Sequence, residues 1–186
     1  IDTDENIRLK YRYLDLRRDD MKRNILARSN TFKSIRNSMD SLSFLELDTP
    51  TLTKSTPEGA KDFLVPSRKQ SGSFYALPQS PQMYKQLFMI SGFNKYYQIA
   101  KCYRDEDSRK DRQPEFTQLD LEILNGTPDE VRNTTETIVK ELLDNVFSIK
   151  VDVPFQDMTY KEAIENYGTD KPDLRIKETI KDLSEI

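Results

Sequence analysis

The sequence contains no histidine, so no imidazole within these 186 residues can act as a general base or a metal ligand. Its single cysteine, Cys102, excludes an internal disulfide and is typical of a reducing compartment, from which we expect a cytoplasmic protein. No apolar run approaches the roughly 18 residues of a membrane span, and the first residues have no signal-peptide pattern. We therefore expect no membrane partner.

Net charge is also small. The 29 basic and 32 acidic residues give −3, which excludes a globally basic nucleic-acid-binding protein. Any contact with nucleic acid must be local, as in the basic loop 109–112. The apolar residues fall in periodic blocks, which indicates one folded domain with room for an incomplete second. Because the chain does not begin with methionine, we expect a piece of a longer protein.

Hydrophobic periodicity predicts a mixture of helices and strands. Turn formers and the absence of a long apolar run predict a loop over 51–73. Ser80 followed by Pro81 is typical of a helix start, with Ser80 as the N-cap. Capping-box patterns at 127–130 and 159–162 mark two further helix starts. The predicted elements are a helix over 19–42, a strand over 44–47 that stops before Pro50, a strand over 74–77, a helix from 80 to Gly92, a helix from 128, a strand over 149–155 and a short helix from 159 to Gly168.

Two strand-like runs flank a short charged loop between residues 103 and 122. On the second run, Thr117, Leu119, Leu121 and Ile123 alternate with Phe116, Gln118, Asp120 and Glu122, which predicts a polar face opposite a buried one. By itself this pattern fits an antiparallel hairpin with a solvated face, and Arg104 with Glu106 fits a surface ion pair.

The complete order of residues in this region is more specific than the alternation alone. Tyr103-Arg104-Asp105-Glu106, a variable loop and Phe116 resemble motif 2 of the class II aminoacyl-tRNA synthetases, and the run 112–120 resembles the bacterial aspartyl type. Segments 55–63, 77–82 with Lys85, and 167–175 have counterparts there in the same order. The resemblance implies an α+β fold, the class II catalytic core with an antiparallel β-sheet flanked by helices, incomplete in this chain. The activity implied is that of an aspartate-tRNA ligase, which makes aspartyl-adenylate and transfers it to tRNA.

Site residues follow from the same resemblance. The catalytic residue is Arg104, whose planar fork of donors suits the bridge between the amino-acid carboxylate and the α-phosphate better than a lysine. Lys85 would face the aspartate side chain, and a buried Asp120 would order Lys85 or the substrate ammonium group. The implied ATP contacts are Arg104, Glu106, Gln113 and Phe116, and the implied aspartate contacts are Glu58, Ser80, Gln82, Lys85, Arg104 and Asp120.

Partner surfaces and domains are implied as well. Arg109, Asp111 and Arg112 match the loop that approaches the tRNA acceptor end. Phe44, Leu45, Leu47 and Pro50 match motif 1, which forms a homodimer, although the same residues could pack on the chain's own sheet. The expected domains are a lead-in from a missing N-terminal domain (1–17), a partial catalytic domain with motifs 1 and 2 (18–168) and the start of an inserted domain (169–186).

Two departures from the family matter. Lys61 stands where an arginine is common, which keeps the charge but loses bidentate geometry. The resemblance implies ATP and Mg²⁺ as cofactors. Motif 3 and the acidic Mg²⁺ ligands have no match in this sequence, so we expect no metal ligands in this chain and an inactive isolated fragment. The alternatives are a non-catalytic dimerisation or tRNA-binding module derived from the synthetase fold, and a synthetase for asparagine or lysine. Whether the asparagine tRNA is also charged stays open.

Overall fold

The computed structural model describes residues 3–56, 58–107 and 109–181. Pro57 and Ser108, together with the first two residues of the expected lead-in and the last five of the expected inserted domain, lie outside the described residues. The chain divides into two compact units, Ile1–Val151 and Asp152–Ile186, which are described separately.

The expected lead-in forms two short helices, α1 (Glu5–Lys10) and α2 (Arg12–Asp15), organised around one buried carboxylate. Asp15 accepts hydrogen bonds from Arg8 Nε at 2.8 Å and from Arg12 Nη1 at 2.5 Å. The bond from Arg8 holds the pKa of Asp15 below its ordinary value, although burial alone would raise it. Ionic contacts therefore hold this segment together, and it carries little apolar core.

The long helix α3 (Asp19–Ser41) confirms the prediction for 19–42. It packs against α5 (Pro128–Phe147), where small buried side chains allow close approach. Ser38 donates a hydrogen bond to Glu141, and Ser34 accepts one from Asn145 Nδ2 at 3.3 Å. Helix α5 begins at the expected Thr127 cap, whose hydroxyl accepts from the backbone of the third helical residue.

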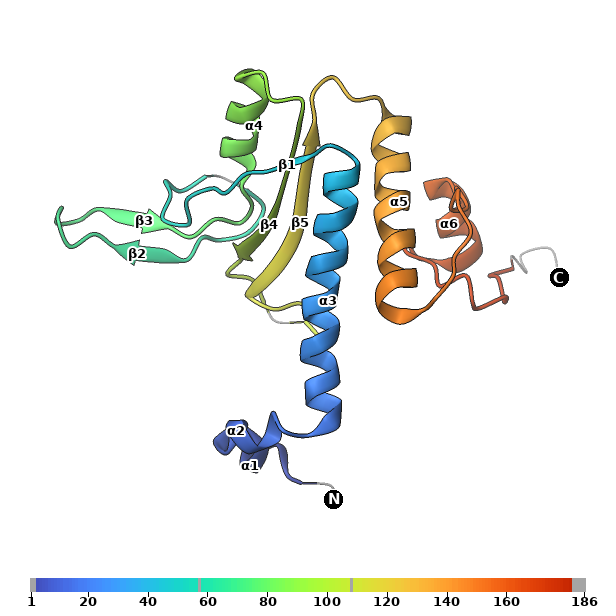
Figure 1. The fold of residues 1–186 in the computed structure, drawn as a ribbon, viewed down its shortest axis with the longest axis horizontal. Coiled ribbons are helices and arrows are strands. Elements are labelled where there is room, and N and C mark those ends of the chain that lie inside the picture. Colours follow the sequence, from blue (N-terminus) through green and yellow to red (C-terminus); the bar gives the residue numbers. More distant parts are fainter. Residues whose placement is uncertain (1–2, 57, 108, 182–186) are drawn as a thin grey trace. The chain divides into compact units, whose positions relative to one another are not determined.

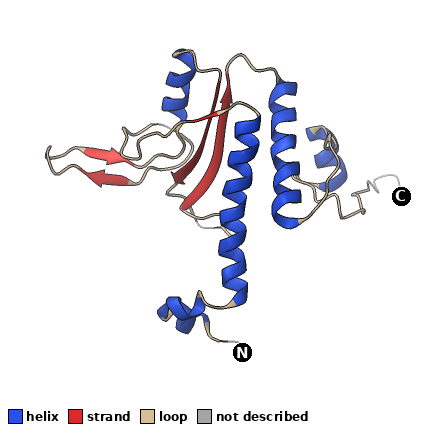
Figure 2. Cartoon of the chain, in the orientation of Figure 1, coloured by secondary structure: helices blue, strands red, loops and turns tan. Residues whose placement is uncertain are grey.

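A three-stranded sheet lies beside these helices in the order β1 (Leu45–Glu46), β4 (Lys95–Tyr103) and β5 (Glu115–Ile123) (Figures 1 and 2). β1 runs parallel to β4, whereas β4 and β5 form the expected antiparallel hairpin. Helices α3 and α5 cover one face of the sheet. The core on that face consists of Ile35, Met39, Phe44, Tyr97 and Ile138, with Leu119, Leu121 and Ile123 packed against it. The alternation predicted for β5 is confirmed.

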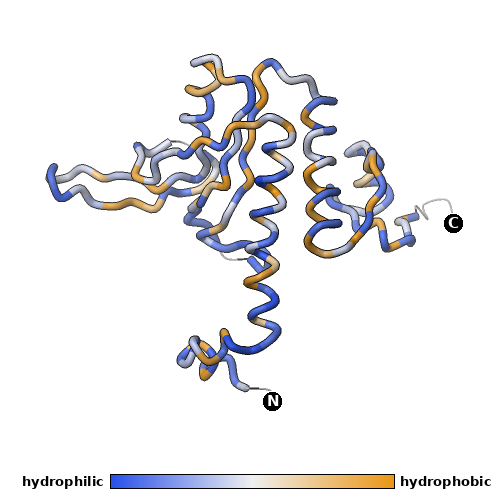
Figure 3. Tube along the Cα trace, in the orientation of Figure 1, coloured by the Kyte–Doolittle hydropathy of each residue, from blue (hydrophilic) through white to orange (hydrophobic). Residues whose placement is uncertain are grey.

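The predicted loop 51–73 is wrong in part, because Leu64–Pro66 forms a short strand, β2. It pairs antiparallel with β3 (Phe74–Ala76), and Figure 3 shows that the turn joining them is hydrophilic. A three-residue strand offers too little alternation for its pairing partner to be inferred from sequence. The hairpin therefore depends on its turn and on the bridge between Thr53 and Ala76.

Helix α4 (Gln82–Ile90) packs on the opposite face of the sheet, where Phe88 lies 5.6 Å from Tyr96 between ring centroids. Its start differs from the prediction: Pro81, not Ser80, occupies the N-cap position, and no side chain caps the helix. The Ser80 hydroxyl bonds to a residue of a distant loop instead, which removes it from the helix end. The expected apolar face, Met83, Leu87 and Ile90, is exposed in this chain.

The second unit contains α6 (Tyr160–Tyr167), which has the predicted capping box between Thr159 and Glu162. Gly168 ends it with φ +68°, a left-handed conformation that favours glycine. The strand predicted over 149–155 is wrong, because this run has no strand partner and Pro154 interrupts its donors. Among the described residues, no helix is long and apolar enough to cross a membrane.

Candidate active site

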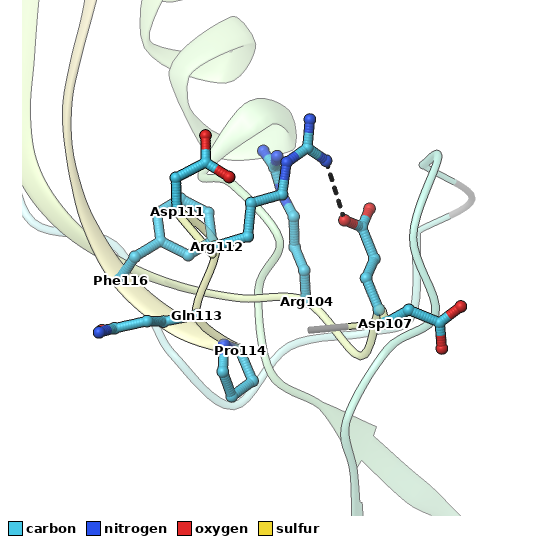
Figure 4. A pocket seen from close by; sticks show the side chains of 8 residues that line it. Arg104, Asp107, Asp111, Arg112, Gln113, Pro114 and Phe116 are labelled. Carbon is cyan, nitrogen blue, oxygen red and sulfur yellow. Dashed lines mark hydrogen bonds and ion pairs between the residues drawn. The ribbon is translucent and has the colours of Figure 1, made fainter. Parts of the chain in front are cut away.

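The hairpin of β4 and β5 holds the first group of predicted site residues. Its register pairs Cys102 with Phe116, and the backbone N–H of Arg104 donates to Pro114 at 2.9 Å, so the pairing continues beyond the strands. The connecting loop folds back over this end of the hairpin and encloses a cavity of about 410 Å³ (Figure 4). Its lining includes every predicted ATP contact: Arg104, Glu106, Gln113 and Phe116.

Two arginines of this cavity already contact the groups predicted to bind adenine. The guanidinium carbon of Arg104 lies 5.1 Å from the centroid of the Phe116 ring, within cation–π range. Arg112 Nη1 lies 3.3 Å from Glu106 Oε2, the ion pair drawn as a dashed line in Figure 4. Both members of that ion pair are substantially exposed, so it contributes little to stability and can open at small cost.

The three residues predicted to contact tRNA all lie on the exposed loop. The loop reverses where the N–H of Arg112 donates to Arg109 at 3.1 Å. Asp111 and Arg112 line the same cavity as the predicted ATP contacts, whereas Arg109 lines a neighbouring hollow of about 540 Å³ together with Gly59 and Lys61. The structure thus places two predicted tRNA residues in the lining of the predicted nucleotide site.

A second cluster lies on the sheet face that carries α4. Lys85 Nζ is 2.9 Å from Asp120 Oδ1, and the side chains of Lys85 and Asp120 are only 13% and 12% exposed, respectively. The same ammonium is 3.3 Å from Glu122 Oε2, a second carboxylate that the sequence reasoning did not assign to the site. Its signal was present, because Glu122 follows Asp120 by two residues and therefore shares its face of β5.

The electrostatics of this cluster favour a charged lysine. Burial lowers the pKa of Lys85, but the hydrogen bonds and charges of Asp120 and Glu122 outweigh burial and raise it overall. The nearby Tyr96 hydroxyl donates to Gln98 at 2.9 Å, and burial together with the Asp120 charge raises the pKa of Tyr96. Asp120 Oδ2 is buried and has no hydrogen-bond partner among the described residues.

The remaining predicted aspartate contacts surround the start of α4. Ser80 Oγ donates to both carboxylate oxygens of Glu58, at 3.2 and 3.4 Å. Gln82 is the first residue of α4 and lies exposed, three residues before Lys85 and thus on the same side of the helix.

Three charged side chains from different chain segments, Glu58, Arg104 and Asp120, act on the buried thiol of Cys102. Burial raises the pKa of its thiol to about 11; the Arg104 charge opposes this rise, and the charges of Asp120 and Glu58 add to it. Glu58, Arg104 and Asp120 therefore lie within electrostatic range of one buried atom. The structure brings the predicted nucleotide and amino-acid contacts together on one side of the sheet.

Sequence reasoning missed Gln79, which is 2% exposed and bonds to the loop that carries Glu58. No periodicity marks it, since its partners lie 17 and 19 residues earlier in the chain.

The predicted dimer residues divide between core and surface. Phe44 is 5% exposed and packs in the chain's own core, whereas Leu45 is 51% exposed. Leu47 donates its N–H to Tyr97 at 3.1 Å and is half-buried, and Pro50 is exposed. Leu45 and Pro50 are therefore the members of this set that a partner could reach, and the interface stays a prediction.

Known proteins resemble the chain over its whole length. Residues 4–184 match the family model described as tRNA synthetases class II (D, K and N). The chain is 54% identical over 186 residues to an aspartate–tRNA ligase of Clostridium kluyveri and 55% identical over 185 residues to one of Clostridium acetobutylicum. It is 54% identical over 182 residues to an aspartate–tRNA(Asp/Asn) ligase of Caldanaerobacter subterraneus. These matches cover 98% to 100% of this chain and 31% to 32% of each relative, so the chain spans about a third of their length.

Proposed function

The chain belongs to the class II tRNA synthetases of the D, K and N type, and we propose that it forms part of the catalytic domain of an aspartate–tRNA ligase. The proposed enzyme joins L-aspartate to ATP as aspartyl-adenylate, releases pyrophosphate and transfers the aspartyl group to tRNA. One observation carries this proposal: Lys85, held by two carboxylates, lies on the same sheet face as Phe116 of the nucleotide cavity.

Activation brings two anions together, the aspartate carboxylate and the α-phosphate. A fixed cation between them offsets their repulsion and stabilises the charge that develops at phosphorus. Arg104 is the candidate, because the backbone bond to Pro114 at 2.9 Å fixes its main chain in the wall of the cavity. Its guanidinium packs over Phe116 in this structure and would move off the ring when adenine stacks there.

Nucleotide binding rearranges the contacts inside the cavity. Adenine would stack on Phe116, and its amino group would donate to Glu106 in place of Arg112. The exposed ion pair between Arg112 and Glu106 costs little to separate, and Arg112 would then be free for phosphate. Gln113 supplies a further polar contact at the same cavity wall.

Recognition of aspartate rests on the second cluster. Lys85 would bind the side-chain carboxylate, and its raised pKa keeps it charged at neutral pH. Asp120 Oδ2 has no hydrogen-bond partner among the described residues, and the substrate ammonium group would donate to it. Glu58, Ser80 and Gln82 would complete the pocket. A neutral amide in place of the side-chain carboxylate would gain much less from Lys85, which favours aspartate over asparagine.

We further propose the partners and the organisation implied by the family. The loop residues Arg109, Asp111 and Arg112 would contact the tRNA acceptor end in a cytoplasmic protein. The motif 1 residues Phe44, Leu45, Leu47 and Pro50 would contribute to a homodimer, with Phe44 acting from within the core. Residues 1–17, 18–168 and 169–186 would be the lead-in, the partial catalytic domain and the start of an inserted domain of a longer protein.

Mg²⁺ would accompany ATP, and its protein ligands would come from parts of a longer protein outside this chain. Within 3–56, 58–107 and 109–181, no group of three or more Asp, Glu, Cys or His side chains is placed to hold a metal ion. We therefore assign no step to a metal bound by these residues.

The test is aspartate-dependent exchange of pyrophosphate into ATP by the full-length protein that includes this chain. Arg104→Lys keeps the charge but loses the fork of donors, so the exchange rate should fall about 100-fold or more. Arg68→Lys makes the same change at an exposed position in the turn between β2 and β3 and should leave the rate unchanged. Near-normal exchange by Arg104→Lys, with an unchanged thermal midpoint, would reject the assignment of Arg104.

A further inference from the structure

The Gln79 side chain bonds to the backbone of a loop as another strand would. Its Oε1 accepts from Ala60 N at 3.2 Å, and its Nε2 donates to Ala60 O at 2.8 Å. The same Nε2 donates to Asp62 Oδ1 at 2.6 Å. A buried side chain thus satisfies both backbone groups of one loop residue and the side chain of another.

This arrangement needs a primary amide. A glutamine presents a donor and an acceptor side by side in one plane, as a peptide group does. A carboxylate at the same position has no donor and would repel Asp62 and the Ala60 carbonyl. Ala60 lies outside the named strands, so the amide of Gln79 stands in for the missing strand partner.

The next residue holds the same loop at a second point. Ser80 donates to Glu58 at 3.2 Å, while Gln79 binds Ala60, two residues further along the loop. The loop is therefore held at two points, at Glu58 through its side chain and at Ala60 through its backbone. The charge of the held Glu58 carboxylate also contributes to the raised pKa of the Cys102 thiol on β4.

We propose that Gln79 is a positioning residue that holds the segment 58–62 so that Glu58 faces the bound amino acid. The proposal deepens the proposed function and rests on it. A loop that must become ordered when substrate arrives weakens binding, because the lost conformational freedom opposes association. By fixing the loop beforehand, Gln79 improves the affinity for aspartate. The loop touches the nucleotide contacts through a separate bond, from Asp105 N to Lys61 O at 3.0 Å, which does not involve the Gln79 side chain.

The experiment measures pyrophosphate exchange in the full-length protein as a function of aspartate and of ATP. Gln79→Glu should raise the KM for aspartate about 10-fold or more, because donors to charged and buried partners are lost. The KM for ATP should change by less than about 3-fold. Gln70→Glu makes the same chemical change in the exposed turn between β2 and β3 and should alter neither constant.

A reciprocal variant separates positioning from general damage. In Gln79→Glu combined with Asp62→Asn, the new amide at 62 can donate to the new carboxylate at 79, which restores that contact with reversed polarity. In the double variant the KM for aspartate should be at least about 3-fold lower than in Gln79→Glu alone. If the two substitutions only damaged the protein, their effects on this KM would add instead of cancelling.

A variant on the loop side covers the case in which Gln79→Glu does not fold. Asp62→Ala removes the acceptor at a half-buried position and should raise the aspartate KM in the same direction. Asp62 also accepts from Ser55, so Ser55→Ala serves as the control for that lost bond.

The outcomes are distinct. An aspartate KM that is unchanged in Gln79→Glu or in Asp62→Ala overturns the positioning role, and so does an equal rise of both KM values. A wild-type protein without aspartate-dependent exchange rejects the proposed function itself, and the role of Gln79 falls with it. A selective rise in the aspartate KM, reversed in the double variant, supports both.

Discussion

Replacing Lys85 by methionine should weaken aspartate binding far more than ATP binding. The substitution keeps most of the aliphatic stem, so it removes the ammonium group with little loss of packing. That group lies 2.9 Å from Asp120 and 3.3 Å from Glu122, in a place where Lys85 and Asp120 are nearly nine-tenths buried. Without it, a substrate carboxylate would meet two negative charges and no cation.

The magnitude follows from the burial. Two unit charges about 4 Å apart attract by about 4 kcal/mol at an effective dielectric constant of about 20. Desolvation of the substrate carboxylate offsets part of this gain, which leaves about 2 to 3 kcal/mol. We therefore expect the KM for aspartate to rise about 30- to 150-fold, while the KM for ATP changes by less than about 3-fold.

The assay is pyrophosphate exchange by the full-length protein at varied aspartate and varied ATP. Lys101→Met is the matched control, because Lys101 lies on β4 and forms its 3.3 Å ion pair with Glu115 at the exposed surface. Such a pair contributes about 0 to 1 kcal/mol, so neither KM should move. An equal rise of both KM values in Lys85→Met would show that Lys85 does not face the amino acid.

Two further predictions concern the fold and need only the chain itself. Met39→Ala, at a core position with no exposed surface, should lower the free energy of unfolding by about 2 to 5 kcal/mol. Met83→Ala, on the exposed face of α4, should lower it by less than about 1 kcal/mol. Similar losses for the two variants in urea titrations would contradict the assigned core. The Cys102 thiol is buried and its pKa is raised to about 11, so it should react with a thiol reagent at pH 8 only after unfolding. The contribution of the neutral thiol to the free energy of unfolding should disappear as pH rises from about 9 through 11. Fast labelling of the native chain at pH 8 would contradict the burial of Cys102.

Long periodic segments were predictable from sequence because each carries its own signal. The helix α3 and the alternation on β5 each extend over several repeats of their period, and the Thr159 cap identifies its helix by a local rule. The resemblance to a known family then assigned Arg104 and Lys85 to the proposed site, whereas periodicity alone would have left them as surface charges.

The missed features depend on contacts between distant residues. The alternation over 149–155 resembles a strand, but a strand also needs a partner, and none pairs with this run. Ser80 has the residue type of a helix cap, yet Glu58, 22 residues earlier, takes its hydroxyl. Glu122 and Gln79 likewise reach their partners only when helix, loop and sheet are assembled, which no local rule describes.

The parallel pairing of β1 with β4 gives the sheet an order of assembly. β4 and β5 meet by closing only the loop 104–114, whereas the bond between Tyr97 and Glu46 joins residues 51 positions apart. Because the entropy cost of closing a loop grows with its length, we expect the hairpin to form before β1 docks onto it. Arg104 and Phe116 would then come together with the hairpin, and fraying of β1 would expose the core without separating them.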